Sequence, residues 1–151
     1  MYRTLQLGLS AAFLVTSSGC WSSDTVIFEL ALSGTAGDAD LAVPVSLEAY
    51  YQSIGEGILE TDIFFIDAFE VVASQPFSHT LSYPLEGGRG LFLFAWADQD
   101  QDGALCAPGV DDEPVGGLRI DQPTEQPLNN LMLTLDRLCI SPDQLAAELQ
   151  P

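Results

Sequence analysis

The sequence predicts an all-β protein, a single antiparallel β-sandwich that ends in a short helix. Apolar and polar residues alternate along several segments of the chain, which is the pattern of half-buried strands. Clusters of Gly, Pro, Asn, Asp and Ser separate these segments. About seven strands divided by frequent turns are typical of a sandwich.

The clearest strand is expected at 41–51, where every odd position is apolar and the even positions include Pro44, Ser46 and Glu48. A continuous apolar run at 91–97 indicates a central strand that is covered on both faces. Aromatic and β-branched residues favour a strand at 63–72. The remaining strands are expected at 25–33, 77–83 and 128–135, and the turns at 34–40, 52–57, 86–90 and 121–127.

A helix is expected at the end of the chain, over 141–151. Ser141 is a suitable N-cap, Pro142 suits the first helical position, and Gln144 completes a capping box. The sandwich domain is then expected to span 25–140 as one domain, the usual size for a chain of this length.

The first 19 residues have the organisation of an export signal. A positive start that includes Arg3 is followed by an apolar run at 5–15 and by small residues at 16–19. The run is shorter than the roughly 20 apolar residues that a transmembrane helix needs. Segment 1–19 is therefore expected to be a signal peptide.

Cys20 follows Ser18 and Gly19 directly, and this junction resembles the lipobox of bacterial lipoproteins. The family usually has Leu three residues before the cysteine, where this chain has Ser17. The resemblance implies palmitate and further lipid on Cys20, a lipidated tether at 20–24, and a membrane anchor stronger than one acyl chain provides. Trp21 stands where the inner-membrane retention signal has Asp, which favours the outer membrane of the cell envelope. The alternative is an ordinary secretory signal that is cut near Ser18 or Gly19.

The charge of the chain excludes one class of partner. The sequence holds 22 acidic residues, no lysine and only four arginines, for a net charge of −18. All of the acidic residues follow residue 19, and they lie between apolar runs rather than in a disordered tail. Such a surface repels nucleic acid and attracts cations or basic partners. No nucleic-acid partner is expected.

The sequence has three cysteines, and Cys20 cannot form a disulfide if it carries lipid. Cys106 and Cys139 then remain, and in an oxidising compartment a disulfide between them is the default expectation. Metal binding by the pair is the rival interpretation. It lacks a CxxC spacing, and the single histidine, His79, is far away in sequence.

The segment DQDQDG at 98–103 is the candidate metal site. Asp98, Asp100 and Asp102 alternate with glutamines and are closed by Gly103, which matches the first half of an EF-hand calcium loop. Three carboxylates this close repel one another unless a cation lies between them. The twelfth position, which should be Glu, is Gly109, and acidic residues resume only at 111–113.

The predicted calcium ligands are three carboxylates, one backbone carbonyl and one closing acidic residue. They are Asp98, Asp100, Asp102, the carbonyl of Ala104, and one of Asp111, Asp112 and Glu113. The alternative is a solvated acidic loop that binds nothing specific.

The stretch at 77–135, with "AWADQDQDG", "DEPVGG" and "LMLTL", resembles bacterial transthyretin-like sandwiches of the carboxypeptidase regulatory or collagen-adhesin B type. The resemblance implies a transthyretin-like or immunoglobulin-like fold. It also implies that Glu113 takes the role of the twelfth residue after an insertion that contains Cys106.

No catalytic motif stands out, and the protein is not expected to be an enzyme. GxSxG, HExxH and phosphate-binding glycine loops are absent from the sequence. His79 shares a strand face with apolar residues and is expected to be a core or cross-strand residue.

The preferred function is therefore a non-catalytic envelope module with an envelope protein or glycan as partner. The alternative is an accessory or hydrolytic domain that acts on extracellular or cell-wall carbohydrate. An exposed platform built from Trp21, Tyr50, Tyr51 or Tyr83 would favour sugar binding.

Overall fold

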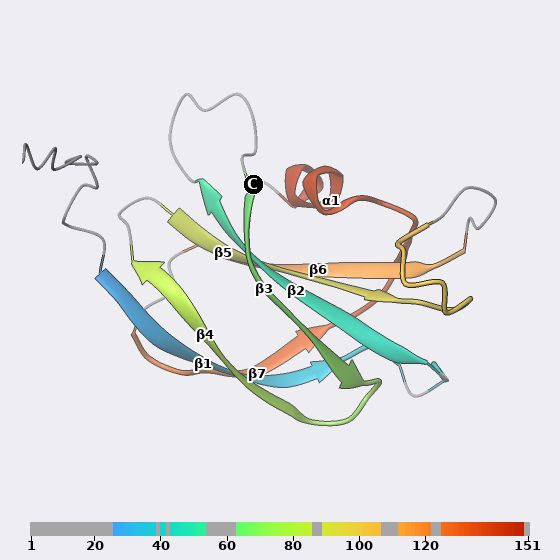
Figure 1. Cartoon of the computed structure of the whole chain (residues 1–151), viewed down its shortest axis with the longest axis horizontal. Helices are drawn as coiled ribbons and strands as arrows, with labels where there is room; N and C mark the ends of the chain where they lie inside the picture. The colour runs from blue at the N-terminus through green and yellow to red at the C-terminus, as the bar shows by residue number, and fades with distance from the viewer. Residues whose placement is uncertain are drawn as a thin grey trace, which may run out of the picture.

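A computed structural model describes residues 26–38, 40–41, 43–53, 63–85, 89–106, 112–121 and 125–149. The expected signal peptide at 1–19, the tether with Cys20 and Trp21, and Asp111 lie outside these residues. Over the described residues, the chain forms eight strands and one helix (Figure 1). The strands are β1 (Val26–Ala36), β2 (Pro44–Ser53), β3 (Ile63–Val72), β4 (Phe77–Leu85), β5 (Arg89–Ala97), β6 (Pro114–Ile120), β7 (Leu128–Leu133) and β8 (Arg137–Leu138), and the helix is α1 (Pro142–Glu148).

The strands form two sheets that pack face to face, as the sequence predicted. One sheet has the order β4-β1-β7 and the other the order β3-β2-β5-β6-β8. Figure 1 shows the smaller sheet beneath the larger one. The core between them is aliphatic, with Leu30, Leu47, Leu81 and Leu93 all at most 1% exposed. The all-β sandwich is thus the fold of this chain.

Strand β5 is the central strand that its continuous apolar sequence predicted. It pairs with β2 on one side and with β6 on the other, both antiparallel. Its odd residues, such as Leu93, face the core between the sheets, whereas Phe92, Phe94 and Trp96 belong to a second cluster on the outer face. Both faces are covered, so every side chain from Leu91 to Ala97 is buried.

The pairing of β1 with β7 is parallel, unlike all the other pairings between described strands. The register shifts between Leu32 and Gly34, at a point where the two backbones come very close. A Cβ atom at Gly34 would lie 2.1 Å from the carbonyl oxygen of Leu131. A glycine in the middle of a strand is here required by the close approach of another backbone.

Strand β6 was not among the strands predicted from the sequence, and its adjacent Gly116 and Gly117 lack the side chains that mark a strand. In the structure these residues pair with Ala95 and Phe94 of β5. A Cβ atom at Gly116 would lie 1.9 Å from the carbonyl oxygen of Thr134. The two glycines therefore serve close packing, and the chain continues as a strand.

Helix α1 begins with the predicted capping box. The Ser141 hydroxyl accepts a hydrogen bond from the backbone amide of Gln144, and the Gln144 side-chain oxygen accepts one from the backbone amide of Ser141. Leu145 and Ala146 pack on the outer cluster of β5, so α1 covers the face of the larger sheet that points away from the smaller one. Within the described ranges, no helix has the length and hydrophobicity that crossing a membrane requires.

Candidate metal centre

The candidate centre lies at one end of the sandwich, where β5 leads out of the larger sheet and β6 returns to it. Asp98 follows the last residue of β5, and Glu113 precedes the first residue of β6. Trp96 of β5 pairs with Val115 of β6. This pairing brings the two carboxylates together although 14 residues separate them in the chain.

Three of the predicted ligands come together in space. One carboxylate oxygen from each of Asp98, Asp100 and Glu113 lies within 4.8 Å of the other two. Calcium holds its oxygen ligands at about 2.3–2.6 Å, so two ligands of one ion lie at most about 5.2 Å apart. The spacing of the three oxygens is compatible with a single calcium ion.

The loop after β5 is shaped by hydrogen bonds from its own backbone to its aspartates. Asp98 accepts from the amides of Asp102 (3.2 Å) and Gly103 (2.9 Å), and Asp100 accepts from the Asp102 amide (3.1 Å). Gln101 and Gly103 adopt positive φ angles, 61° and 76°. Positive φ suits glycine best. The turn that the sequence assigned to Gly103 is therefore present, and the loop holds Asp98 and Asp100 side by side.

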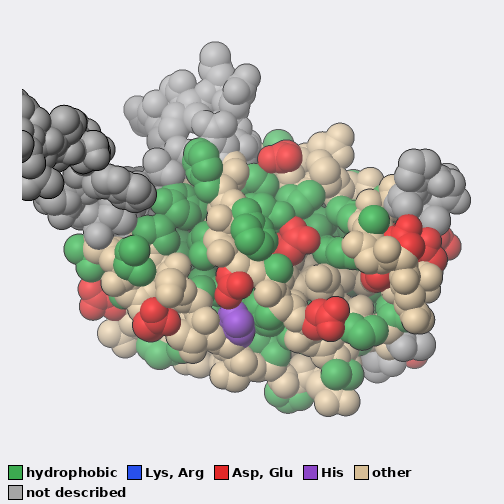
Figure 2. All heavy atoms as spheres, in the orientation of Figure 1, with side chains coloured by type: hydrophobic (Ala, Val, Ile, Leu, Met, Phe, Trp, Pro, Cys, Tyr) green, Lys and Arg blue, Asp and Glu red, His purple; other side chains and the backbone are tan. Residues whose placement is uncertain are grey.

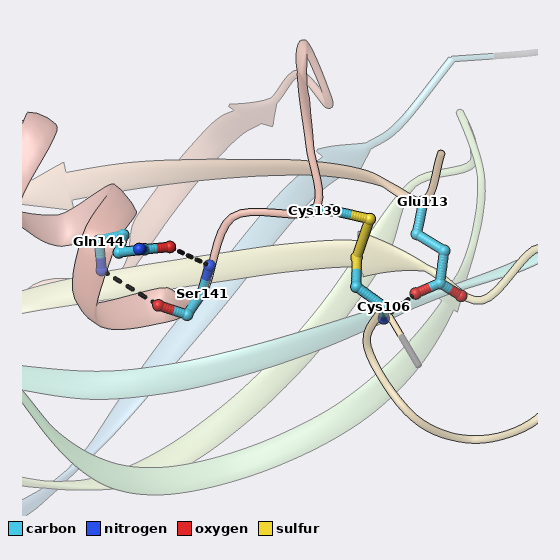
Figure 3. The surroundings of a disulfide bond; sticks show 5 residues. All are labelled: Cys106, Glu113, Cys139, Ser141 and Gln144. Atoms are coloured by element: carbon cyan, nitrogen blue, oxygen red, sulfur yellow. Dashed lines mark hydrogen bonds between the residues drawn. A yellow bond between two sulfur atoms is a disulfide. The ribbon is translucent and has the colours of Figure 1, made fainter. Parts of the chain in front are cut away.

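Glu113 differs from the two aspartates because it is completely buried. Its side chain is 0% exposed. The Oε2 atom accepts a hydrogen bond from the backbone amide of Cys106 (Figure 3). The Oε1 atom is buried and has no hydrogen-bond partner among the described residues. A buried carboxylate oxygen without a donor is costly, and the Glu113 carboxylate is one of the group of three.

The electrostatics of the cluster favour a cation. Two unit charges 4–5 Å apart repel by about 3–4 kcal/mol at an effective dielectric constant of about 20. No arginine side chain forms a described ion pair with Asp98, Asp100 or Glu113; those of Arg119 and Arg137 pair with Asp121, Asp136 and Glu148. Figure 2 shows acidic side chains scattered over the visible face of the sandwich. A bound divalent cation would offset this repulsion.

Among the described acidic residues, Asp102 and Asp112 are not part of the cluster of three. The Oδ1 atom of Asp102 accepts a hydrogen bond from the Ala104 amide at 2.8 Å, so this carboxylate caps the loop. Ala104 and Asp112 are exposed, and Asp111 lies outside the described residues. Of the two described residues proposed to close the site, Asp112 and Glu113, it is Glu113 that lies with Asp98 and Asp100.

A disulfide between Cys106 and Cys139 adjoins the centre, and its two cysteines are the predicted pair. Glu113 contacts both of them through hydrogen bonds. Its side chain accepts from the Cys106 amide, and its backbone carbonyl accepts from the Cys139 amide at 3.1 Å. The disulfide joins the end of the acidic loop to the segment that follows β8, as Figure 3 shows.

A polar group on the outer face of the larger sheet lies close to the centre. Glu48 of β2 accepts hydrogen bonds from the Trp96 indole (3.1 Å) and from the Tyr50 hydroxyl. Burial, followed by the hydrogen bond to Glu48, raises the pKa of Tyr50 well above its ordinary value. Trp96 and Asp98 line one shallow groove with Ser46 and Glu70. The groove borders the acidic cluster.

His79 bridges the two sheets, in agreement with the predicted cross-strand role. Its Nε2 atom lies 2.8 Å from Asp67 Oδ2 on β3, and its ring stacks on Phe69 at 3.8 Å. This contact joins β4 to β3 and has no part in the acidic cluster.

The three described tyrosines among the residues considered for a sugar-binding platform do not form an exposed surface. Tyr83 is 1% exposed, and Tyr50 and Tyr51 are half-buried. Tyr51 packs against Tyr83, and Tyr50 packs against Phe92. Trp21 lies outside the described residues.

Comparison with known proteins adds no relative from which a function can be taken. No family model, no curated protein and no solved structure matches this chain. The proposed function therefore depends on the chemistry of the residues themselves.

Proposed function

We propose that this protein is a non-catalytic β-sandwich module of the bacterial cell envelope that holds a calcium ion between β5 and β6. The observation that carries the calcium proposal is the fully buried carboxylate of Glu113, which clusters with the carboxylates of Asp98 and Asp100 and whose Oε1 atom has no hydrogen-bond partner among the described residues. A buried charge needs a partner, and hard oxygen donors select calcium or a similar hard cation.

The role proposed for the ion is structural. It would join the loop after β5 to the start of β6 and hold that end of the sandwich rigid. Asp98, Asp100 and Glu113 supply three oxygens, whereas calcium takes six to eight. Backbone carbonyls and water would supply the rest, so a dissociation constant on the order of 10⁻⁴ to 10⁻³ M is expected, as in extracellular modules.

A calorimetric titration of the full chain with calcium tests the site. The wild type is expected to bind one ion, and Asp100→Ala is expected to lower the affinity at least tenfold because it removes one of the three carboxylates. Glu29→Gln is the matched control, since Glu29 faces solvent from β1 and hydrogen-bonds Ser82. Magnesium, which prefers a smaller octahedral site, is expected to bind more weakly. Flat traces for the wild type would refute the site.

The second part of the proposal is that Cys20 carries lipid, which anchors the protein in a membrane. The support is the order of charge, apolar run and small residues before Cys20, together with the resemblance to bacterial lipoproteins. Envelope proteins or glycans are the proposed partners. The strongly acidic composition argues against nucleic acid.

Intact-mass measurement of protein purified from its native host tests the anchor. The expected product begins at Cys20 and is heavier than its sequence by the mass of attached acyl chains. A Cys20→Ser variant is expected to lose this added mass and to move from the membrane fraction to the soluble fraction. A product that retains Met1, or an unmodified Cys20, would contradict the lipoprotein proposal.

A further inference from the structure

Glu113 belongs to the acidic cluster and also accepts hydrogen bonds from both cysteines of the disulfide. The state of the disulfide and cation binding by the cluster are therefore linked. The carboxylate of Glu113 is one of the three in the cluster; its Oε2 atom accepts from the Cys106 amide, and its buried Oε1 atom has no hydrogen-bond partner among the described residues. Its backbone carbonyl accepts the Cys139 amide at 3.1 Å. Each half of the disulfide thus touches the residue on which the cation site depends.

The backbone at both cysteines is held in an unfavourable conformation. Cys106 has a φ angle of 51° and Cys139 has one of 48°. Residues other than glycine seldom adopt such angles, and they do so only where the surrounding structure imposes them. When the cross-link between them is opened, both residues are free to leave this region. The Cys106 amide then no longer holds Glu113 Oε2 in place.

We infer that the Cys106–Cys139 disulfide is a redox control on the cation site: its reduction weakens calcium binding, and calcium in turn protects the disulfide from reduction. This inference depends on the proposed calcium site. In the oxidised protein, the loop end and Glu113 are already ordered, so calcium binding need not order them. In the reduced protein, binding must order them again, which lowers the affinity.

The reaction is a two-electron thiol–disulfide exchange with a dithiol as reductant. The thiolate of the dithiol attacks one sulfur of the Cys106–Cys139 bond and forms a mixed disulfide, and its second thiol then releases the protein. Cys106 and Cys139 each gain one electron and one proton, and the dithiol becomes a cyclic disulfide. The freed thiols are soft ligands and do not replace carboxylates around calcium.

The effect of reduction on calcium affinity and the effect of calcium on reduction must be equal in size, because they describe one thermodynamic coupling. If reduction lowers the affinity for calcium by a given factor, saturating calcium must shift the thiol–disulfide equilibrium by the same factor. Coupling between two sites is typically about 5–150-fold. We expect a value of about tenfold here, because β5 and β6 hold Asp98 and Glu113 near each other in either redox state.

The first test compares calcium affinity in the two states by calorimetry. The oxidised wild type is compared with the double variant Cys106→Ser/Cys139→Ser, after circular dichroism has shown equal strand content. The variant is expected to bind calcium about tenfold more weakly. Equal affinities would overturn the redox inference and leave the calcium site intact. No binding by the oxidised wild type would refute the calcium site and, with it, the redox inference.

The second test uses the wild type and does not require the variant to fold. The full chain is equilibrated in mixtures of reduced and oxidised dithiothreitol, with excess calcium or with a chelator, and is then alkylated. Peptide mass mapping reads Cys106 and Cys139 separately from Cys20. Calcium is expected to raise the ratio of reduced to oxidised dithiothreitol at the midpoint about tenfold. An unchanged midpoint, with calcium bound, would overturn the inference.

Two controls separate a local effect from general stabilisation of the fold. Trimethylamine N-oxide stabilises folded proteins without occupying a site, so its shift of the midpoint measures the general effect, which calcium must exceed. Glu113→Gln is expected to remove the calcium-dependent shift, whereas Glu29→Gln is expected to keep it. A shift that survives Glu113→Gln would show that Glu113 does not couple the two sites.

Discussion

Replacing Glu113 with glutamine is expected to reverse the order of stability of wild type and variant, depending on whether calcium is present. In excess chelator, the variant is expected to be the more stable by about 1 kcal/mol, the lower end of the cost of a buried acceptor without a donor, since the wild type buries such a carboxylate oxygen. The amide of glutamine keeps an acceptor for the Cys106 amide and places a donor where the wild type has the unpartnered Oε1 atom. Repulsion inside the cluster falls as well.

With calcium the order is expected to invert. At a concentration between about ten and one hundred times the dissociation constant, the ion stabilises the wild type by about 1–3 kcal/mol, and the variant gains nothing. Urea unfolding of both proteins in chelator and in about 10 mM calcium measures both arms. The crossing is the diagnostic result, because a purely structural role of Glu113 would change stability equally in both conditions.

The matched control for this experiment is Glu113→Asp. Aspartate keeps the charge but withdraws the carboxylate by one methylene, so it is expected to lose the calcium effect without the gain in chelator. Glu29→Gln, which removes one charge from the outer face of β1, is expected to behave as the wild type. If calcium still stabilised Glu113→Gln, the ion would bind at a site that does not include Glu113.

Removal of the disulfide is expected to lower the stability of the fold. The bond joins residues 33 positions apart, and closing a loop of this length stabilises a fold by about 3–4 kcal/mol in the chain-entropy model. Release of Cys106 and Cys139 from positive φ angles offsets part of this, at about 1 kcal/mol for each residue. The net loss is therefore expected at about 1–2 kcal/mol, which lowers the Tm by roughly 3–10 °C.

Thermal and urea unfolding of Cys106→Ser/Cys139→Ser measure this loss, in chelator so that calcium does not contribute. Cys20→Ser is the control, since Cys20 precedes the first described strand, and it is expected to leave the Tm unchanged. Reduced and alkylated wild type is expected to match the double variant. A change of less than about 0.5 kcal/mol, the ordinary size for surface substitutions, would mean that the strands alone fix this end of the sandwich.

Most of the fold could be predicted because its main signal is local. Alternation of apolar and polar residues located β2, and the continuous apolar run located β5 at the centre of its sheet. The capping box at Ser141 and Gln144 located the start of α1. Each of these signals lies within a few residues, where side-chain direction follows from the backbone alone.

The missed features depend on contacts between distant segments. The sequence alone does not explain Gly116 in a strand. The structure does, because the carbonyl oxygen of Thr134 occupies the place that a Cβ atom would need. The parallel pairing of β1 with β7 joins residues about one hundred positions apart. Neither contact has a local signal in the sequence.

The candidate site shows the same division between local and distant contacts. The spacing of Asp98 and Asp100 and the turn at Gly103 were evident from the sequence, which also identified Cys106 and Cys139 as a pair. The sequence left three acidic residues as candidates for closing the site. Of the two that the structure describes, burial and the pairing of β5 with β6 favour Glu113 over Asp112.

By itself, the sequence determined which parts this protein has: an acidic chain, a set of strands, a cysteine pair and an aspartate-rich turn. These properties follow from residue type and from spacing over a few positions. Only the tertiary structure decided that a buried carboxylate faces the turn and that the same residue touches both halves of the disulfide. The physical reason is that burial and hydrogen bonding depend on which strands are neighbours, and pairing across the sheet sets that arrangement.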